Sequence, residues 1–284
     1  MSRAAIAVFV LALSAFTTAQ TSAPATSAVS PAPENWPTAQ FASSKDESVH
    51  KAYDLLNQMI RALGGDAYLN VQSMQSEGRT YGFYHGQPSG MGLVFWRFWE
   101  WPDKERVELT KQRDVVELFT GDKGYEITYK GTATQDPKDV EDYIRRRNHS
   151  LEWVIRKWLP ASKTMLLYSG TAMVERNLAD QVTVLNAEND SVIISIDSTT
   201  RLPVRISYSW RDPVDRQFDD ENIVFSNYKP VQGIQTPYST VRNLNGEMAN
   251  QRFITSAIYN NSLSPTLFEP KGTIYTPGKQ TPAK

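Results

Sequence analysis

The sequence predicts a mainly β fold with an α component, built on one strongly curved antiparallel sheet of about eleven to twelve strands. Three observations support this prediction. Short apolar segments follow one another along most of the chain, separated by turns. Two amphipathic helical patterns interrupt the series, one before the strands and one among them. A sheet with this many strands must curl, close or split, and a curved sheet with helices on one face is the simplest arrangement.

Composition excludes several classes of protein. The chain has 284 residues, of which 40% are hydrophobic and 21% charged, ordinary values for a globular protein. A net charge of −1 argues against a general nucleic-acid-binding protein, which carries a basic excess. With no cysteine and three histidines, the chain offers no disulfide, thiolate metal site or cysteine nucleophile, and few imidazole catalysts. These facts favour a binding role over catalysis.

Residues 1–19 have the pattern of a secretory signal peptide. Arg3 supplies a positive start, residues 4–16 form an apolar run, and small residues up to Ala19 offer a cleavage site. An apolar run of about 13 residues is too short to cross roughly 30 Å of hydrocarbon as a helix. We therefore expect an exported protein, bacterial and either periplasmic or secreted, with no transmembrane segment after cleavage.

The rest of the chain divides into a leader, one domain and a tail. Residues 20–45 are rich in Thr, Ser, Ala and Pro and hold few apolar anchors, which favours a flexible leader. We expect the folded domain to cover residues 46–272 and a second flexible segment to cover residues 273–284.

The domain is expected to contain two helices. Apolar residues recur at helical spacing over residues 46–63, and Ser44 or Asp46 can cap the start of this helix. Gly64-Gly65 ends it, because glycine accepts the left-handed backbone found at helix C-termini. An apolar stripe with charged residues beside it predicts the second helix over residues 138–159.

The predicted strands surround the second helix. Their close spacing favours an antiparallel meander over alternating strand–helix units. Five are expected before that helix, at 71–84, 91–101, 106–111, 115–120 and 125–129. Seven are expected after it, at 164–174, 181–188, 192–197, 204–210, 222–228, 235–241 and 251–258.

The most unusual segment is the strand predicted over residues 91–101, because both of its faces are largely apolar. Such a strand is either covered on both sides within a core or lines an apolar cavity on one side. Arg97 interrupts one face, so it must reach solvent, pair with a carboxylate or serve a ligand headgroup. That face carries Leu93, Phe95, Arg97, Trp99 and Trp101, and the other carries Val94, Trp96, Phe98 and Glu100.

Two charged clusters are typical of solvated surface. Residues 145–147 are three arginines that follow acidic residues at helical spacing, although such a cluster can also contact anionic lipid or a partner. Residues 212–221 are rich in Asp but lack the glycine-bearing EF-hand pattern, which favours a charged loop over a metal site. No nucleophile-elbow, zinc-protease or phosphate-loop motif is present, so the sequence does not favour an enzyme.

Four short segments occur in an order that is found in a known family. Residues 98–106 (FWEWPDKER) match a strand that ends in an aromatic residue shortly before Pro-Asp. Residues 115–129 match a strand, an Asp-Gly-Lys-type turn and an aromatic return strand, and residues 197–203 match the turn before a late strand. Residues 267–272 match a closing Phe-x-Pro segment. Over roughly residues 47–272, the set resembles the LolA-like superfamily of outer-membrane lipoprotein carriers and lipoprotein-sorting proteins.

This resemblance implies an open half-barrel with two helices covering its concave face. It implies a periplasmic, non-enzymatic protein that needs no cofactor or metal and binds lipid or acyl chains, whose burial gains about 0.8 kcal/mol per CH₂. In the carriers, an arginine directly before the proline of the first motif latches the lid; this chain has Trp101 there. Arg97, four residues earlier, is therefore the candidate for a latch or a headgroup contact.

We expect a protein that binds a lipid or a lipoprotein acyl chain in an apolar cavity, with outer-membrane lipoprotein sorting as one form of this role. Because Arg97 interrupts the odd-numbered face of the aromatic strand, the even-numbered face is expected to line the cavity. The expected cavity residues are Val94, Trp96, Phe98, Trp153 and Trp158.

The alternative is a non-enzymatic protein-interaction or envelope-sensor module with a packed interior. Its partner would be an envelope protein, bound through residues 145–147 or 212–221. Neither hypothesis requires nucleic acid, a cofactor or a metal.

Overall fold

The computed structural model describes residues 34–272, 274 and 275, and most of its regular structure is β-strand. The first strands are β1 (Ser73–Tyr84), β2 (Gln87–Pro88), β3 (Leu93–Glu100), β4 (Lys104–Leu109), β5 (Val115–Thr120), β6 (Lys123–Thr128) and β7 (Gly131–Thr134). The later strands are β8 (Met165–Val174), β9 (Asn177–Leu185), β10 (Ser191–Asp197), β11 (Pro203–Arg211), β12 (Phe218–Val231), β13 (Ile234–Leu244), β14 (Glu247–Tyr259) and β15 (Ile274–Tyr275). The helical elements are η1 (Ala39–Phe41), α1 (Glu47–Leu63), α2 (Asp66–Leu69), α3 (Pro137–Asn148), α4 (Leu151–Trp153), η2 (Val154–Trp158) and η3 (Pro265–Phe268).

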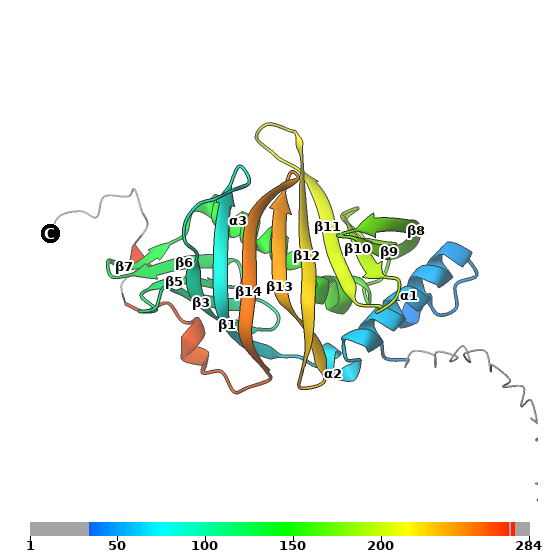
Figure 1. Ribbon diagram of the computed structural model, residues 1–284, viewed down its shortest axis with the longest axis horizontal. Coiled ribbons are helices and arrows are strands. Elements are labelled where there is room, and N and C mark those ends of the chain that lie inside the picture. Colours follow the sequence, from blue (N-terminus) through cyan, green and yellow to red (C-terminus); the bar gives the residue numbers. More distant parts are fainter. Residues whose placement is uncertain (1–33, 273, 276–284) are drawn as a thin grey trace, which may run out of the picture. The chain divides into compact units, whose positions relative to one another are not determined.

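The described strands form one open, curved sheet with helices on its concave face, which confirms the predicted half-barrel (Figure 1). Their order is β15-β7-β6-β5-β4-β3-β1-β14-β13-β12-β11-β10-β9-β8, with β2 paired to β1. All pairs are antiparallel except β15 with β7. The meanders β3–β7 and β8–β14 meet where β1 lies between β3 and β14. The strands beyond the twelve expected are β2, β7 and β15, which are too short to show an alternating pattern.

Helix α1 forms as its sequence predicts. The side chain of Asp46 accepts hydrogen bonds from the backbone N–H groups of Ser48 (2.8 Å) and Val49 (3.2 Å). Gly64 ends the helix at a φ of 131°, a conformation that other residues rarely adopt. The buried face of α1 packs against β8, β9 and β13 and forms the centre of the main core.

The second helix is broken, whereas the sequence predicts one continuous helix over residues 138–159. Helix α3 ends at Asn148, and Ser150 starts the next helical segment by accepting a hydrogen bond from the backbone N–H of Trp153 (3.2 Å). A serine favours the N-cap position because its side chain replaces an intrahelical partner. The following turns, α4 and the π-helical η2, bury Val154 and Ile155 in the core. We call residues 137–158 the lid segment; it is bent at residues 149–150.

The packed structure begins by Trp36, ten residues before the predicted domain boundary at residue 46. Trp36 and Phe41 are buried in the main core, and the Trp36 indole donates a hydrogen bond to Asp66 (3.2 Å). These aromatic anchors, with hydrogen bonds from Thr38 to Asn57 and from Gln40 to the carbonyl of Ala161 (2.9 Å), hold residues that composition assigned to the flexible leader. Residues 274–275, placed in the predicted tail, form β15 beside β7. The predicted signal peptide and residues 20–33 lie outside the described residues, as do 273 and 276–284.

None of the helices that the structure describes is both long and apolar enough to cross a membrane.

Candidate ligand-binding site

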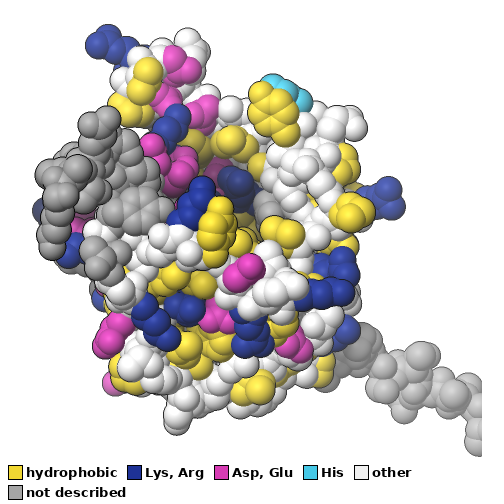
Figure 2. Space-filling model, turned by 90° about the vertical axis from the view of Figure 1, so that its left-hand side faces the viewer, with side chains coloured by type: hydrophobic (Ala, Val, Ile, Leu, Met, Phe, Trp, Pro, Cys, Tyr) yellow, Lys and Arg dark blue, Asp and Glu magenta, His cyan; other side chains and the backbone are white. Residues whose placement is uncertain are grey.

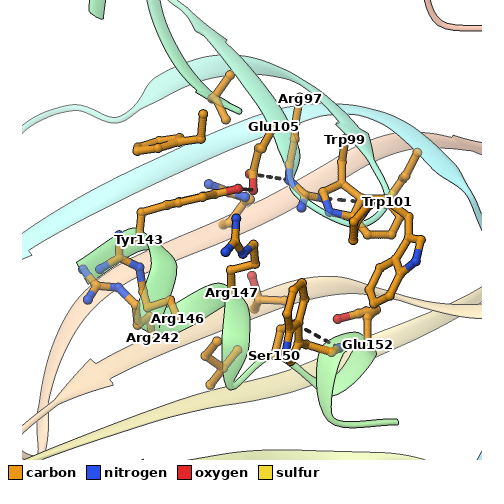
Figure 3. A pocket seen from close by; sticks show the side chains of 18 of the residues that line it. Arg97, Trp99, Trp101, Glu105, Tyr143, Arg146, Arg147, Ser150, Glu152 and Arg242 are labelled. Carbon is orange, nitrogen blue, oxygen red and sulfur yellow. Dashed lines mark hydrogen bonds and ion pairs between the residues drawn. The ribbon is translucent and has the colours of Figure 1, made fainter. Parts of the chain in front are cut away.

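A cavity of about 520 Å³ lies between the concave face of the sheet and the lid segment (Figure 3). Strands β1, β3, β4, β5, β12, β13 and β14 form one wall, and α3, α4 and η2 form the other. Figure 2 shows that the end of the molecule carrying β6 and β7 is hollowed, with basic, acidic and hydrophobic side chains at the rim of the hollow. The volume falls within the 300–1,000 Å³ that is typical of sites for small organic ligands.

One end of the cavity is aromatic. Trp99 and Trp101 come from the end of β3, and Trp153 comes from the lid segment. The ring centroids of Trp101 and Trp153 are 5.6 Å apart, and those of Trp99 and Trp101 are 6.2 Å apart. Such rings offer a large, rigid apolar surface to a ligand. The other aromatic and apolar residues here are Tyr68, Val71, Met74 and Tyr259.

Trp101 also joins the sheet to the lid segment. The guanidinium of Arg156 lies 4.0 Å from the centre of a Trp101 ring, a cation–π contact. The same guanidinium donates a hydrogen bond to the carbonyl of Val71 (2.7 Å). The ring of Trp101 thus belongs to the sheet side of the contact, and the guanidinium of Arg156 belongs to the lid segment. An arginine joins the two here, although it comes from the lid segment and not from position 101.

The remainder of the cavity is charged. Figure 3 shows Arg146 and Arg242 at the end opposite Trp99 and Trp101. The cavity is therefore amphipathic, whereas the sequence predicts an apolar one. Its charged residues are Arg97, Arg146, Arg147, Arg156, Arg242 and Arg252, with Glu105, Glu117 and Glu152.

A mostly buried ion pair between Arg97 and Glu105 spans the middle of the cavity wall. Arg97 Nε donates to Glu105 Oε1 over 2.7 Å, and the hydroxyl of Tyr143 on α3 donates to Glu105 Oε2 over 3.2 Å. Burial alone would raise the pKa of Glu105, but the charge and hydrogen bond of Arg97 outweigh burial and lower it. Burial alone would lower the pKa of Arg97, and Glu105 reverses this effect. The pKa of Tyr143 is raised by burial and by the charge of Glu105.

This pair predicts a pH-dependent stability. Because the folded-state pKa of Glu105 lies below 4.5, the value of an unperturbed Glu, its charge stabilises the fold fully above about pH 4.5. This stabilisation is lost as the pH falls through the folded-state pKa. Urea unfolding would measure the free energy of unfolding of the wild type and of Glu105→Gln at several pH values. The difference between the two proteins should shrink as the pH is lowered from about 5. A difference that stays constant down to the acid transition would contradict the assignment.

Three other cavity arginines are held by the protein. Arg147 Nη1 donates to the carbonyl of Gly121 over 2.7 Å, and Arg242 Nη1 lies 3.3 Å from Glu221 Oε2. Arg156 is held by Val71, as described above. These bonds fix the orientation of the lid segment and of β13 around the cavity.

The structure brings two of the expected site residues, Arg97 and Trp153, to the cavity. Val94, Trp96 and Phe98 do not line it, because the odd-numbered face of β3 turns inward. Phe98 and Trp96 belong instead to a second apolar cluster on the opposite face of the sheet, with Phe268 of η3. The sequence favours the even face because Arg97 interrupts the odd one, but Glu105 compensates that charge.

Trp158 also lies away from the cavity. It is 7% exposed and belongs to the main core, where its ring meets that of His149 edge-on at 5.4 Å. The bend at residues 149–150 explains this placement, because it turns the end of the lid segment into the core.

Sequence reasoning missed the contribution of β13 and β14. Thr240 lies opposite Arg252, and Arg242 lies opposite Asn250, so all four share the concave face. From the sequence alone, an arginine within a strand is as consistent with a surface position as with a cavity-lining position. Only the pairing of these strands in the middle of the curved sheet would have identified them as cavity residues.

The two charged clusters lie in different parts of the structure. Arg145 is held by Asp142 and by Glu141 (3.8 Å), as the helical spacing predicts, whereas Arg146 and Arg147 line the cavity. Residues 212–221 cover the turn and first strand residues of the β11–β12 hairpin, where Asp212 caps the turn. Within the described residues, no group of three His, Asp or Glu side chains is arranged to hold a metal ion.

Comparison with known proteins identifies relatives of the fold. No protein-family model and no curated protein matches this sequence. Among solved structures, a DUF1329 family protein from Desulfovibrio piger matches with a TM-score of 0.54 and 14% identity, over 77% of this chain and 97% of that chain. At 14% identity, this likeness concerns the fold alone.

Two further solved structures are similar over 77% of this chain. A putative outer membrane lipoprotein-sorting protein domain from Vibrio parahaemolyticus has a TM-score of 0.49, 8% identity and 96% coverage of its chain. A LolA superfamily protein from Nitrosomonas europaea has a TM-score of 0.48, 9% identity and 97% coverage. The chain thus shares the fold of the DUF1329 family protein, and the names of the other two structures agree with the LolA-like resemblance of the sequence motifs.

Proposed function

We propose that this chain is an exported, non-enzymatic protein that binds a lipid, or the acyl chain of a lipoprotein, in the cavity beneath its lid segment. The observation that carries the proposal is the cavity itself, with tryptophans at one end and arginines at the other. A ligand with one apolar and one polar end matches both parts of this lining.

Binding by this site needs no covalent step. Each CH₂ group that leaves water gains about 0.8 kcal/mol, and Trp99, Trp101 and Trp153 provide the apolar surface. Release requires that the lid segment separate from Trp101, which breaks the cation–π contact with Arg156. Export rests on the signal-peptide pattern of residues 1–19. The partners in this proposal are the lipid or acylated protein and the envelope proteins that deliver and receive it.

The direct test is native mass spectrometry of the full chain after its export to a bacterial periplasm, followed by organic extraction. We expect adducts that extract as phospholipid or as acylated peptide. A mass without adducts, together with no binding of an added fluorescent fatty acid, would contradict the proposal.

The cavity assignment makes a prediction about two tryptophans on opposite faces of the sheet. Trp153→Ala should weaken binding of a fluorescent fatty acid about tenfold, equivalent to about 1.4 kcal/mol, because it removes an aromatic wall of the cavity. Trp96→Ala is the matched control: Trp96 is also partly buried but packs on the other face, and it should leave affinity within twofold. Equal losses in both variants, with unchanged thermal unfolding, would place the ligand elsewhere.

A further inference from the structure

Two of the six cavity arginines differ from the rest. Among the described residues, Arg146 and Arg252 have neither a hydrogen-bonded nor an ion-paired side-chain partner, whereas the other four are held by Glu105, Gly121, Val71 or Glu221. Arg146 comes from the lid segment and Arg252 from β14, so the two approach the cavity from opposite walls.

Arg252 is the more deeply placed of the two. Its Nε atom is buried without a hydrogen-bond partner, and its guanidinium lies 5.0 Å from the centre of the Phe95 ring. Burial lowers the pKa of Arg252, and the neighbouring charge of Arg97 lowers it further. Strand β14 fixes the residue between Thr80 of β1 and Thr240 of β13. A partly buried guanidinium with an unpartnered Nε is costly unless an anion compensates it.

The carboxylates of the cavity are too few to compensate its arginines, because Glu105, Glu117 and Glu152 face six guanidinium groups. Glu105 is already engaged by Arg97 and Tyr143. Glu117 is exposed, its pKa is raised by burial of part of its surroundings, and no hydrogen bond or ion pair joins it to an arginine among the described residues. The protein thus leaves positive charge at this end of the cavity.

Arg242 adds to this charge on the same surface. In the antiparallel pair of β13 and β14, Arg242 and Arg252 lie diagonally across from each other on the concave face. Figure 3 shows Arg146, from the lid segment, at the same end of the cavity as Arg242. Guanidinium groups present planar pairs of N–H donors that match the oxygens of carboxylate and phosphate.

We propose that the polar end of the ligand is an anion, a carboxylate or a phosphate, bound by Arg252 together with Arg146 and Arg242. This inference rests on the proposed function, since the apolar tail of the same ligand lies against the tryptophans. It makes the protein selective for anionic over neutral amphiphiles. The headgroup contact moves from Arg97, which is occupied by Glu105, to Arg252 on a strand that the sequence did not single out.

The test compares ligands that share one tail. Isothermal titration of the full chain would use a long-chain fatty acid, the alkyl phosphate and fatty alcohol of the same length, and inorganic phosphate. We expect both anionic amphiphiles to bind at least tenfold tighter than the alcohol. Arg252→Gln should remove this preference, weakening the anions at least tenfold and leaving the alcohol within twofold. Arg205→Gln is the matched control, because Arg205 also has a buried Nε without a partner but does not line the cavity.

The thermal unfolding midpoint separates a binding role from a structural one. Removing an uncompensated, partly buried cation should leave the midpoint of Arg252→Gln unchanged or raised, whereas loss of a structural contact would lower it. Arg252→Lys keeps the charge and should keep part of the preference; it serves as the second variant if the glutamine variant does not fold.

Each outcome bears on one of the two proposals. Equal affinity for fatty acid, alkyl phosphate and alcohol would overturn the anion site and leave the proposed function standing. Inorganic phosphate binding as tightly as the alkyl phosphate would support the anion site and overturn lipid binding. No binding of any amphiphile or of phosphate would overturn both.

Discussion

Replacing Glu105 by glutamine is expected to lower the free energy of unfolding at neutral pH by roughly 3 kcal/mol. The substitution leaves Arg97 without its counter-charge. The guanidinium of Arg252 is close enough to repel that of Arg97, so the unpaired charge is further destabilised. Breaking a buried ion pair by removing one partner costs about 3–5 kcal/mol. We expect the lower end of this range because the side chain of Arg97 is 22% exposed, which leaves part of its charge solvated.

The double substitution of Arg97→Met with Glu105→Leu provides the control, measured by urea unfolding beside the single variant. Replacing both charges with apolar side chains of similar size removes the uncompensated cation, so stability should return to within about 1 kcal/mol of the wild type. If the single and double variants lose the same stability, the effect is lost packing and the ion pair does not explain it.

Replacing Gly78 by alanine is expected to cost roughly 3 kcal/mol or more. A Cβ atom at this position would lie 1.9 Å from the carbonyl oxygen of Phe253 and 2.9 Å from the Cα of Ile254. Both are backbone atoms of β14, at the point where the register between β1 and β14 shifts. Relief of the clash therefore requires β14 to move, and Arg252 lies on that strand beside Phe253.

The matched control is Gly90→Ala, since a Cβ at Gly90 meets nothing within 4 Å. It should change stability by less than about 0.5 kcal/mol. Chemical unfolding of both variants, followed by titration with the anionic amphiphile, checks the argument. A Gly78→Ala protein with wild-type stability and wild-type preference for anions would show that the contact between β1 and β14 does not position the site.

Much of the fold could be predicted because its signals are local. Asp46 and Gly64 mark the ends of α1 through their own side-chain and backbone chemistry. The longer strands alternate over enough residues to be recognised, whereas β2, β7 and β15 do not. The break in the second helix also has a local cause, the cap at Ser150. It was not predicted because the apolar stripe continues through this position and indicates an unbroken helix.

The face of β3 that lines the cavity could not be predicted, because both faces are apolar. Its orientation depends on two contacts made by other parts of the chain. Glu105 on β4 compensates Arg97, which lets the odd-numbered face turn inward. Phe268, near the end of the domain, covers Phe98 on the opposite face. The arginines of β13 and β14 join the site for the same reason: their neighbours are set by strand pairing.

The open sheet ends at β8, which pairs only with β9 among the described strands. Another chain can add a strand to an unpaired sheet edge and so start a fibre. Strand β8 also exposes two apolar side chains, Met165 and Met173. Two features limit this risk. The backbone N–H of Tyr168 is taken by Ser48 of α1 (2.9 Å), and a bulge before Thr171, with Gly170 at a φ of 93°, bends the strand. The edge of β8 therefore offers two short stretches of free backbone N–H and C=O groups in place of one long stretch. This disfavours strand addition by another chain, although the half-barrel stays open.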